Sequence, residues 1–237
     1  MTDLSYVDAW VFDLDNTLYP AECNLFRQID ARMAAFIERR LGVETGAARR
    51  LQKDFYVKYG TTLAGLMREH GVKPREFLDY VHDIDLSVVA ENRVLASRIA
   101  ELPGRKFIFT NGSTTHAERV IGRLGFERAF DAIFDIHAAD YLPKPHRDTY
   151  EKFLARHEIA APSATMFEDI AHNLEAAHAL GMTTVLVASE APWIADEPAD
   201  KRPAHPADRF DHVHHVTDDL TAFLRAARTS ALSGATT

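Results

Sequence analysis

The chain has little cysteine, no long apolar run and no excess of positive charge, and each shortage excludes a class of protein. Cys23 is the only cysteine among 237 residues, so an internal disulfide framework is excluded and a reducing compartment is expected. No apolar run is long enough to span a bilayer. The formal net charge of −8 argues against a general nucleic-acid binder, which needs a basic face for the phosphate backbone.

The two ends of the sequence carry further expectations. The stretch MTDLSYVDAW at the start has early acidic residues and no basic segment followed by an apolar one, so we expect no signal peptide and a cytoplasmic location. The stretch TSALSGATT at the end, residues 229–237, has low complexity and is expected to be a disordered tail. We expect no nucleic acid and no membrane as partner, and a monomer or homodimer.

Five short apolar runs predict buried β-strands. They are nearly continuous in apolar residues rather than alternating, as expected for a parallel sheet that helices cover on both faces. The runs are Ala9–Phe12, Lys106–Phe109, Ala132–Phe134, Thr165–Phe167 and Thr183–Val187. A late strand is predicted at His212–Val216, followed by a closing helix near Leu220–Leu224.

Helical patterns separate these runs. After the second run, Ala117, Val120, Ile121 and Leu124 recur at the spacing of one helix face, and Thr115 and Glu118 are placed as a capping box. Two more helices are predicted around Tyr150–Leu154 and Leu174–Leu180, the second ending at Gly181. The alternation of strand and helix predicts a doubly wound α/β domain with a Rossmann-like parallel sheet.

Residues 21–102 break this alternation. One amphipathic helix is predicted from Leu25 to Ile37, ending near Gly42, and no convincing strand lies in the segment. Further helical patterns surround Leu51, Phe55, Leu63, Met67, Phe77, Val81, Leu95 and Ile99. The sequence therefore predicts an α/β core from residues 1–20 and 103–228, with an all-helical cap inserted at residues 21–102.

Chemically useful residues lie at or after four predicted strands. The carboxyl ends of parallel strands are where such sheets bind ligands. The first strand is followed by Asp13 and Asp15, the second by Thr110-Asn111-Gly112, and the fourth by Glu168-Asp169; Lys144 lies in the loop after the third. Each piece alone has a structural explanation as a helix cap, a common turn or a surface charge. Together, in this order, they predict a catalytic site.

These motifs resemble those of the haloacid dehalogenase superfamily of phosphotransferases, and the resemblance extends over nearly the whole chain. The helical insertion resembles that superfamily's cap. The stretches DLDNTLYP, YGTTLAGL, VHDIDLS and MFEDIAHNLEAAHALGM are similar to the pyrimidine 5′-nucleotidase subfamily. The resemblance implies a phosphatase whose substrate is a small phosphorylated metabolite, namely the pyrimidine nucleotide UMP or CMP.

The resemblance also implies a metal and a covalent step. A phosphate monoester is a dianion, so a carboxylate nucleophile needs a cation beside it. Mg²⁺ would be held by Asp13, Asp169 and the backbone carbonyl of Asp15, with Glu168 binding directly or through water. Asp13 would attack phosphorus to form an aspartyl-phosphate, and Asp15 would protonate the leaving alkoxide and later activate water. Burial near like charge is expected to raise the pKa of Asp15.

Other residues are expected to bind the substrate. Thr110 and the amides around Asn111 and Gly112 would bind the phosphoryl oxygens, and Lys144 would neutralise charge on this group and on Asp13. By resemblance alone, four residues of the insertion are candidates for recognising the base, with helix packing as the alternative for each. They are Tyr59, Thr61, His82 and Asp85.

One histidine cluster is not expected to bind metal. His212, His214 and His215 lie close in sequence but have no acidic or cysteine partner at useful spacing. We therefore expect a solvated strand end there.

Several alternatives use similar residues. A haloacid dehalogenase proper is disfavoured, because that branch needs no Mg²⁺ and lacks an aspartate at the position of Asp15. A sugar-phosphate mutase or another phosphatase stays open, because cap contacts set the substrate. A phospho-accepting signalling receiver also uses Asp, a hydroxyl and Lys, but has no helical insertion after its first strand. A catalytically inactive binding module is a further alternative, although every expected catalytic position is filled.

Overall fold

The computed structural model describes residues 2–126, 128–196 and 202–229. It contains a six-stranded sheet in the order β3-β2-β1-β4-β5-β6, with all neighbouring strands parallel. The strands are β1 Ala9–Phe12, β2 Arg105–Phe109, β3 Ala132–Phe134, β4 Ala164–Glu168, β5 Thr183–Val187 and β6 His215–Thr217. The predicted doubly wound parallel sheet is confirmed. The late strand begins at His215 rather than at the predicted His212, and residues 230–237 of the predicted tail lie outside the described residues.

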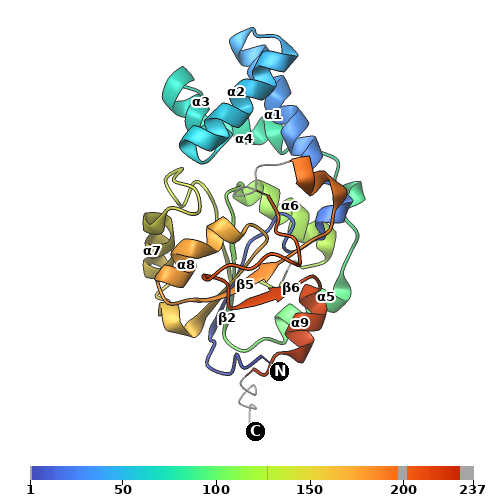
Figure 1. Ribbon diagram of the computed structural model, residues 1–237, viewed down its shortest axis with the longest axis vertical. Helices are drawn as coiled ribbons and strands as arrows, with labels where there is room; N and C mark the ends of the chain where they lie inside the picture. Colours follow the sequence, from blue (N-terminus) through green and yellow to red (C-terminus); the bar gives the residue numbers. More distant parts are fainter. Residues whose placement is uncertain (1, 127, 197–201, 230–237) are drawn as a thin grey trace.

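Helices cover both faces of the sheet (Figure 1). They are α5 Arg93–Ala100, α6 Thr114–Leu124, α7 Arg147–Arg156, α8 Leu174–Ala179 and α9 Leu220–Ala226. Successive residues of β1 point to opposite faces, as the pleat of a strand requires. Trp10 and Phe12 belong to the core that includes residues of α5, α6 and α9, whereas Ala9 and Val11 belong to the core that includes residues of α7 and α8. Burial on both faces explains why the strand sequences are apolar without alternation.

The pairing of β1 brings the ends of three strands to one edge. Phe12 is the register partner of both Ile108 in β2 and Phe167 in β4. The ladder continues one residue further, since the Asp13 N–H donates to the Phe167 carbonyl at 2.9 Å. The residues that follow these strands therefore converge on one place.

The residues between β1 and β2 form helices and connecting segments, with no strand among them. The long helices are α1 Phe26–Leu41, α2 Thr45–Tyr59, α3 Thr62–His70 and α4 Pro74–Val81, and short 3₁₀ turns lie at η1 Ala21–Cys23 and η2 Leu86–Val88. Figure 1 shows α1 to α4 gathered at the end of the molecule opposite both termini. We refer to residues 26–81 as the four-helix cap.

Helix α5 lies elsewhere. It packs against α9 beside the sheet, away from the four-helix cap. The helices of residues 21–102 therefore lie in two parts of the molecule: α1 to α4 form the four-helix cap, and α5 lies beside the sheet. The domain boundary near residue 102 stays a prediction. No helix in the described ranges has the length and apolarity needed to cross a membrane.

The capping box predicted for α6 is wrong. The N-cap is Ser113, whose hydroxyl accepts the His116 N–H at 3.3 Å. Only four residues separate the end of β2 from α6, so the helix begins at Thr114, before the predicted cap at Thr115. The Thr114 hydroxyl donates to Asp135 Oδ2 at 2.8 Å, which fixes this first turn.

Candidate active site

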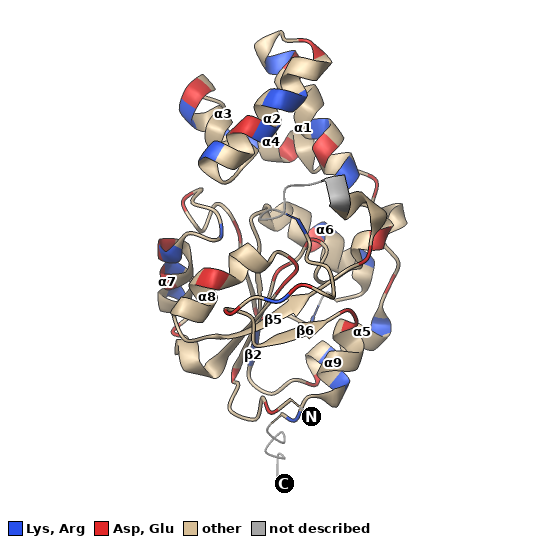
Figure 2. Cartoon of the chain, in the orientation of Figure 1, with Lys and Arg blue, Asp and Glu red and all other residues tan. Residues whose placement is uncertain are grey.

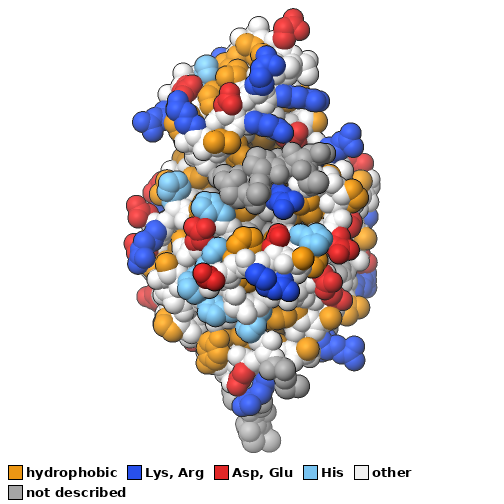
Figure 3. All heavy atoms as spheres, in the orientation of Figure 1, with side chains coloured by type: hydrophobic (Ala, Val, Ile, Leu, Met, Phe, Trp, Pro, Cys, Tyr) orange, Lys and Arg blue, Asp and Glu red, His pale blue; other side chains and the backbone are white. Residues whose placement is uncertain are grey.

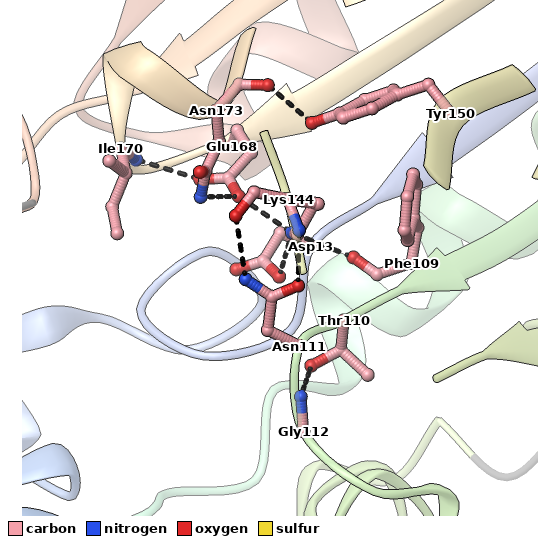
Figure 4. Close-up of polar contacts among 10 residues, drawn as sticks. All are labelled: Asp13, Phe109, Thr110, Asn111, Gly112, Lys144, Tyr150, Glu168, Ile170 and Asn173. Atoms are coloured by element: carbon pink, nitrogen blue, oxygen red, sulfur yellow. Dashed lines mark hydrogen bonds and ion pairs between the residues drawn. The ribbon is translucent and has the colours of Figure 1, made fainter. Parts of the chain in front are cut away.

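Lys144 is the centre of a buried charge cluster (Figure 4). Its Nζ donates to Asp13 Oδ1 at 2.6 Å, to Glu168 Oε1 at 2.7 Å and to the Phe109 carbonyl at 2.9 Å. Burial alone would lower the pKa of Lys144, but the two carboxylates reverse this effect and raise it. The lysine therefore stays charged, and its ammonium lies against the predicted nucleophile Asp13.

The loop after β2 holds the Lys144 loop in place. Asn111 Oδ1 accepts the backbone N–H of Lys144 at 2.8 Å, and Asn111 Nδ2 donates to the Lys144 carbonyl at 3.4 Å. The Asn111 side chain is thus engaged by the protein, which leaves the predicted contact with phosphoryl oxygens to backbone groups and to Thr110.

Gly112 allows a close turn beside Thr110. The Thr110 hydroxyl accepts the Gly112 N–H at 2.9 Å. A Cβ on Gly112 would lie 3.2 Å from that hydroxyl oxygen, which is closer than most side chains tolerate. Glycine therefore suits this position because of the close approach.

Three carboxylates gather at the same strand ends. Asp13, Glu168 and Asp169 are buried, and each offers an oxygen within 4.8 Å of the others. Burial, together with the charges of Glu168 and Asp15, raises the pKa of Asp13 to about 7 although Lys144 opposes the shift. Burial and Glu168 also raise the pKa of Asp169. Uncompensated negative charge of this kind favours a bound cation.

The hydrogen bonds rank these carboxylates as metal ligands. Glu168 Oε1 accepts from Lys144 and from Asn173 Nδ2, the latter at 2.7 Å, and Oε2 accepts the Ile170 N–H at 2.8 Å. Asp169 Oδ2, by contrast, is buried without a partner among the described residues. Buried polar atoms are normally hydrogen-bonded, so this oxygen fits a ligand position. The donor set fits a hard cation such as Mg²⁺, with Asp13 and Asp169 as better candidates than Glu168.

Asp15 turns away from this cluster. Its Oδ1 accepts from the Tyr19 hydroxyl at 2.6 Å and from His116 Nε2 at 2.9 Å. Burial disfavours its charge, but His116 and Tyr19 outweigh this effect and lower the pKa of Asp15 to about 2. The expectation of a raised pKa at Asp15 is wrong, because these donors face the carboxylate. The pKa that is raised belongs to its neighbour Asp13.

Tyr19, His116 and Asn173 are contacts of the site that the sequence did not assign. Tyr19 and Asn173 lie a few residues after the motifs, so their proximity to Asp15 and Glu168 carried a weak signal. His116 is separated from Asp15 by 101 residues. No spacing rule links the two, since the contact exists only once β1 and α6 are placed together.

A cavity lies between the charge cluster and the four-helix cap. The core contributes Asp13, Asp15, Thr110, Asn111, Gly112, Lys144, Glu168 and Asp169 among its lining residues. The cap contributes apolar side chains, namely Phe26, Ile29, Met33, Leu63, Phe77, Leu78 and Val81, and nearly as many polar or charged ones, namely Asp30, Gln52, Lys53, Tyr56, Thr61 and Thr62. Every residue predicted for the catalytic and metal site therefore borders one space.

The four candidates for base recognition separate into two pairs. Thr61 and His82 line the cavity. Tyr59 and Asp85 are not among the lining residues. The Tyr59 hydroxyl donates to Glu69, and Asp85 is an exposed N-cap whose carboxylate accepts the Ser87 N–H. A role in recognition is consistent only with the first pair.

Among the described residues, charges and histidines elsewhere on the surface form no second site of this kind. Figure 2 shows basic and acidic residues mixed along the four-helix cap and α7, and Figure 3 shows histidine side chains spread over the visible face of the core. His212 Nε2 is 2.8 Å from the Ala171 carbonyl, and His214 Nδ1 is 2.8 Å from the Thr184 hydroxyl. In the described ranges, the carboxylate cluster is the only group of metal-ligand type.

Comparisons with known proteins place this site in a familiar context. Residues 7–181 match the family described as haloacid dehalogenase-like hydrolase. Phosphate metabolism protein 8 of Saccharomyces cerevisiae is 25% identical over an alignment of 193 residues, which covers 74% of this chain and 60% of that protein. The chain thus spans about 60% of the length of this curated relative.

Solved structures show the same fold at low identity. CbbY from Rhodobacter sphaeroides, in complex with phosphate, has a TM-score of 0.60 and 18% identity, covering 93% of this chain and 97% of that one. L-2-haloacid dehalogenase from Xanthobacter autotrophicus, with chloropropionic acid covalently bound, has a TM-score of 0.55 and 16% identity, covering 92% and 97%. At these identities the likeness concerns the fold alone.

Proposed function

The chain belongs to the haloacid dehalogenase-like hydrolase family, and we propose that it is a Mg²⁺-dependent phosphatase acting through an aspartyl-phosphate. The observation that carries this proposal is the buried cluster at the strand ends. Lys144 Nζ lies 2.6 Å from Asp13 Oδ1. Asp169, whose Oδ2 has no partner among the described residues, belongs with Asp13 to the same cluster of three carboxylates. Phosphoryl transfer from a dianionic ester requires a nucleophile, a fixed positive charge and an oxygen that is available to bind a metal cation.

In the first step a carboxylate oxygen of Asp13 attacks phosphorus. The bond from phosphorus to the ester oxygen breaks, and Asp15 gives a proton to the leaving alkoxide. The Lys144 ammonium offsets negative charge on Asp13 and on the transferring group, while the Thr110 hydroxyl and the Asn111 N–H donate to the phosphoryl oxygens. When bound at Asp13 and Asp169, Mg²⁺ supplies further positive charge beside the phosphate.

In the second step Asp15 takes a proton from water, which attacks the phosphorus of the aspartyl-phosphate. The acyl-phosphate bond breaks, inorganic phosphate leaves and the Asp13 carboxylate is restored. The Tyr19 and His116 donors favour the ionised form of Asp15, which is the form that the second step needs. The substrate-bound site must supply the protonated form for the first step.

We further propose pyrimidine nucleoside 5′-monophosphates, UMP or CMP, as substrates. Two cap stretches that resemble the pyrimidine 5′-nucleotidases supply lining residues: YGTTLAGL contributes Thr61 to Leu63, and VHDIDLS contributes Val81 and His82. The cap lining combines apolar side chains such as Phe26 and Phe77 with polar ones such as Gln52. This combination suits a flat base with polar edges better than a polyhydroxylated sugar, whose hydroxyls would lose hydrogen bonds to water over the apolar part. The name of the yeast relative is consistent with phosphate chemistry and does not specify a substrate.

A phosphate-release screen tests both levels of the proposal. UMP, CMP, AMP, GMP and glucose phosphates are compared by kcat/KM with Mg²⁺ and with excess chelator. We expect release that depends on Mg²⁺ and a roughly ten- to hundredfold preference for UMP and CMP. A preference for AMP or a hexose phosphate would reject the nucleotide specificity and retain the phosphatase. Full activity in chelator would reject the metal.

A further inference from the structure

The two donors to Asp15 act on the same oxygen. Tyr19 and His116 both donate to Oδ1, and in the described part of the chain no hydrogen bond falls on Oδ2. A Cβ at Gly112 would lie 3.9 Å from Oδ2, so this oxygen faces the turn expected to bind the phosphoryl group. The Asp15 side chain is 20% exposed and lines the cavity. Oδ1 is therefore the anchored oxygen, and Oδ2 is the one available for proton transfer.

His116 is itself held by a residue at the end of the four-helix cap. His116 is fully buried in α6, and the ring of His82 stacks on it with centroids 4.3 Å apart and planes 12° apart. His82 is the C-cap of α4, and its Nδ1 lies 3.1 Å from the Ser113 hydroxyl. The plane of the His116 ring, and hence the direction of its Nε2, depends on this stacked partner.

Two arginines on the face of α6 that carries His116 donate hydrogen bonds to the segment that follows α4. Arg119 Nη1 donates to the His82 carbonyl at 2.6 Å, and Arg119 Nη2 donates to the Ile84 carbonyl at 3.1 Å. Arg123 Nε donates to the Leu86 carbonyl at 3.2 Å. Positions 116, 119 and 123 share one helix face, since they are three and four residues apart. One face of α6 thus links the return segment from the cap to the Asp15 contact.

We propose that His116 is a positioning residue for the acid–base group Asp15, and that His82 couples this positioning to the docked end of α4. The inference rests on the proposed function, because proton transfer by Asp15 is part of it. A carboxylate held at Oδ1 cannot rotate freely, so Oδ2 stays aimed at the ester oxygen in the first step and at water in the second. Small losses of such alignment are costly in rate.

This role has a signature that a structural role lacks. An ester with a poor leaving group needs a proton as its P–O bond breaks, whereas an electron-poor aryl ester leaves without one. Loss of Asp15 alignment therefore slows phosphoryl transfer from the two esters to Asp13 unequally. General damage to the site, such as poorer phosphate binding, slows them equally. Phenyl phosphate and p-nitrophenyl phosphate are a suitable pair, because they have similar shapes and differ in leaving group.

The experiment compares kcat/KM for these two esters in the 237-residue chain with Mg²⁺. This ratio reports the steps up to formation of the aspartyl-phosphate, whereas kcat also contains its hydrolysis, which both esters share. His116→Leu is expected to lower kcat/KM for phenyl phosphate by about 10- to 100-fold and for p-nitrophenyl phosphate by less than about threefold. His116→Gln, whose amide nitrogen can replace Nε2, should recover most of the loss. The control His178→Leu changes an exposed histidine of α8 and should alter neither ester.

Further variants keep the inference falsifiable. His116 is buried, so if His116→Leu fails to fold, Tyr19→Phe takes its place, because it removes only the other donor to Oδ1. An equal fall in kcat/KM for both esters, or no fall, would overturn the positioning role. His82→Leu should show the same bias to a smaller extent, and a uniform effect there would overturn the coupling to α4. A wild-type chain inert toward both esters would instead reject the proposed phosphatase.

Discussion

The core and the four-helix cap border the same cavity with different chemistry. The core presents charges at strand ends, such as Asp13 and Lys144, each fixed by hydrogen bonds to buried neighbours. The cap presents apolar side chains, such as Phe26 and Phe77, among polar ones such as Gln52. This difference suggests a division of labour, with phosphoryl transfer performed by the core and the leaving group selected by the cap. Changes on the two sides should then have different kinetic consequences.

The largest effect is expected from the core residue Asp13. Asp13→Asn removes the nucleophile at little steric cost and should lower kcat by about 10⁴-fold or more for every ester, as loss of a nucleophile does in other hydrolases. Thermal unfolding should show an intact fold. The matched control Asp8→Asn lies before β1, where Asp8 binds the Ser163 hydroxyl at the surface, and should retain activity. Near-wild-type turnover by Asp13→Asn would end the covalent mechanism.

The next effect concerns the unpartnered carboxylate of the core. Asp169→Asn should lower kcat/KM by about 100-fold or more at fixed Mg²⁺, with partial recovery at higher Mg²⁺. Binding also predicts that Mg²⁺ raises the melting temperature of the wild type and not of Asp169→Asn. Glu175→Gln, in the exposed part of α8, is the control. Equal stabilisation of both chains by Mg²⁺ would place the cation elsewhere.

A smaller and more selective effect is expected from the cap. Gln52 is 6% exposed, and its Nε2 donates to Asp30 Oδ1, with both residues lining the cavity. Gln52→Leu should change the ratio of kcat/KM for UMP and AMP by about tenfold, while p-nitrophenyl phosphate changes by less than about threefold. Val57→Ala, exposed on the same helix α2, is the control. A common factor for all esters would break the distinction between core and cap.

The smallest expected effect concerns movement of the four-helix cap, measured by hydrogen exchange. Water should be excluded during the first step and admitted in the second, so we predict that the four-helix cap moves as a unit over the site. Beryllium fluoride with Mg²⁺, as a phosphoryl mimic, should slow hydrogen exchange of amides in residues 26–81 by a few-fold. Amides of β1 and β4 serve as internal controls, since their exchange should already be slow. Unchanged exchange throughout the cap would count against closure.

The core side of this comparison could be predicted from the sequence. The bounds of β1, β3 and β5 match the predicted apolar runs, because strands buried on both faces leave a continuous apolar signal. In a parallel sheet the ends of neighbouring strands meet, so the polar residues after each run must converge. Asp13 and Asp169 could therefore be placed together before any distance was known.

The cap side could not be predicted to the same depth. Periodicity located α1 to α4, but it does not say which helix faces meet the cavity, and Tyr59 and Asp85 do not line it. The predicted direction of the pKa shift of Asp15 was wrong for a related reason. The contact with His116 joins residues far apart in sequence, and its electrostatic effect exceeds the local one between Asp13 and Asp15. Long-range side-chain contacts of this kind carry no signal in a single sequence.

The covalent step at Asp13 is tested most directly in a chain that can complete only the first half of the reaction. Asp15→Asn should still be phosphorylated by p-nitrophenyl phosphate, whose leaving group needs no proton, but should hydrolyse the phosphoenzyme slowly. After acid quench, mass spectrometry should find one phosphoryl group on the peptide that contains Asp13, together with a burst of about one equivalent of nitrophenolate. Steady release without a burst, or a phosphoryl group on any other residue, would contradict the mechanism.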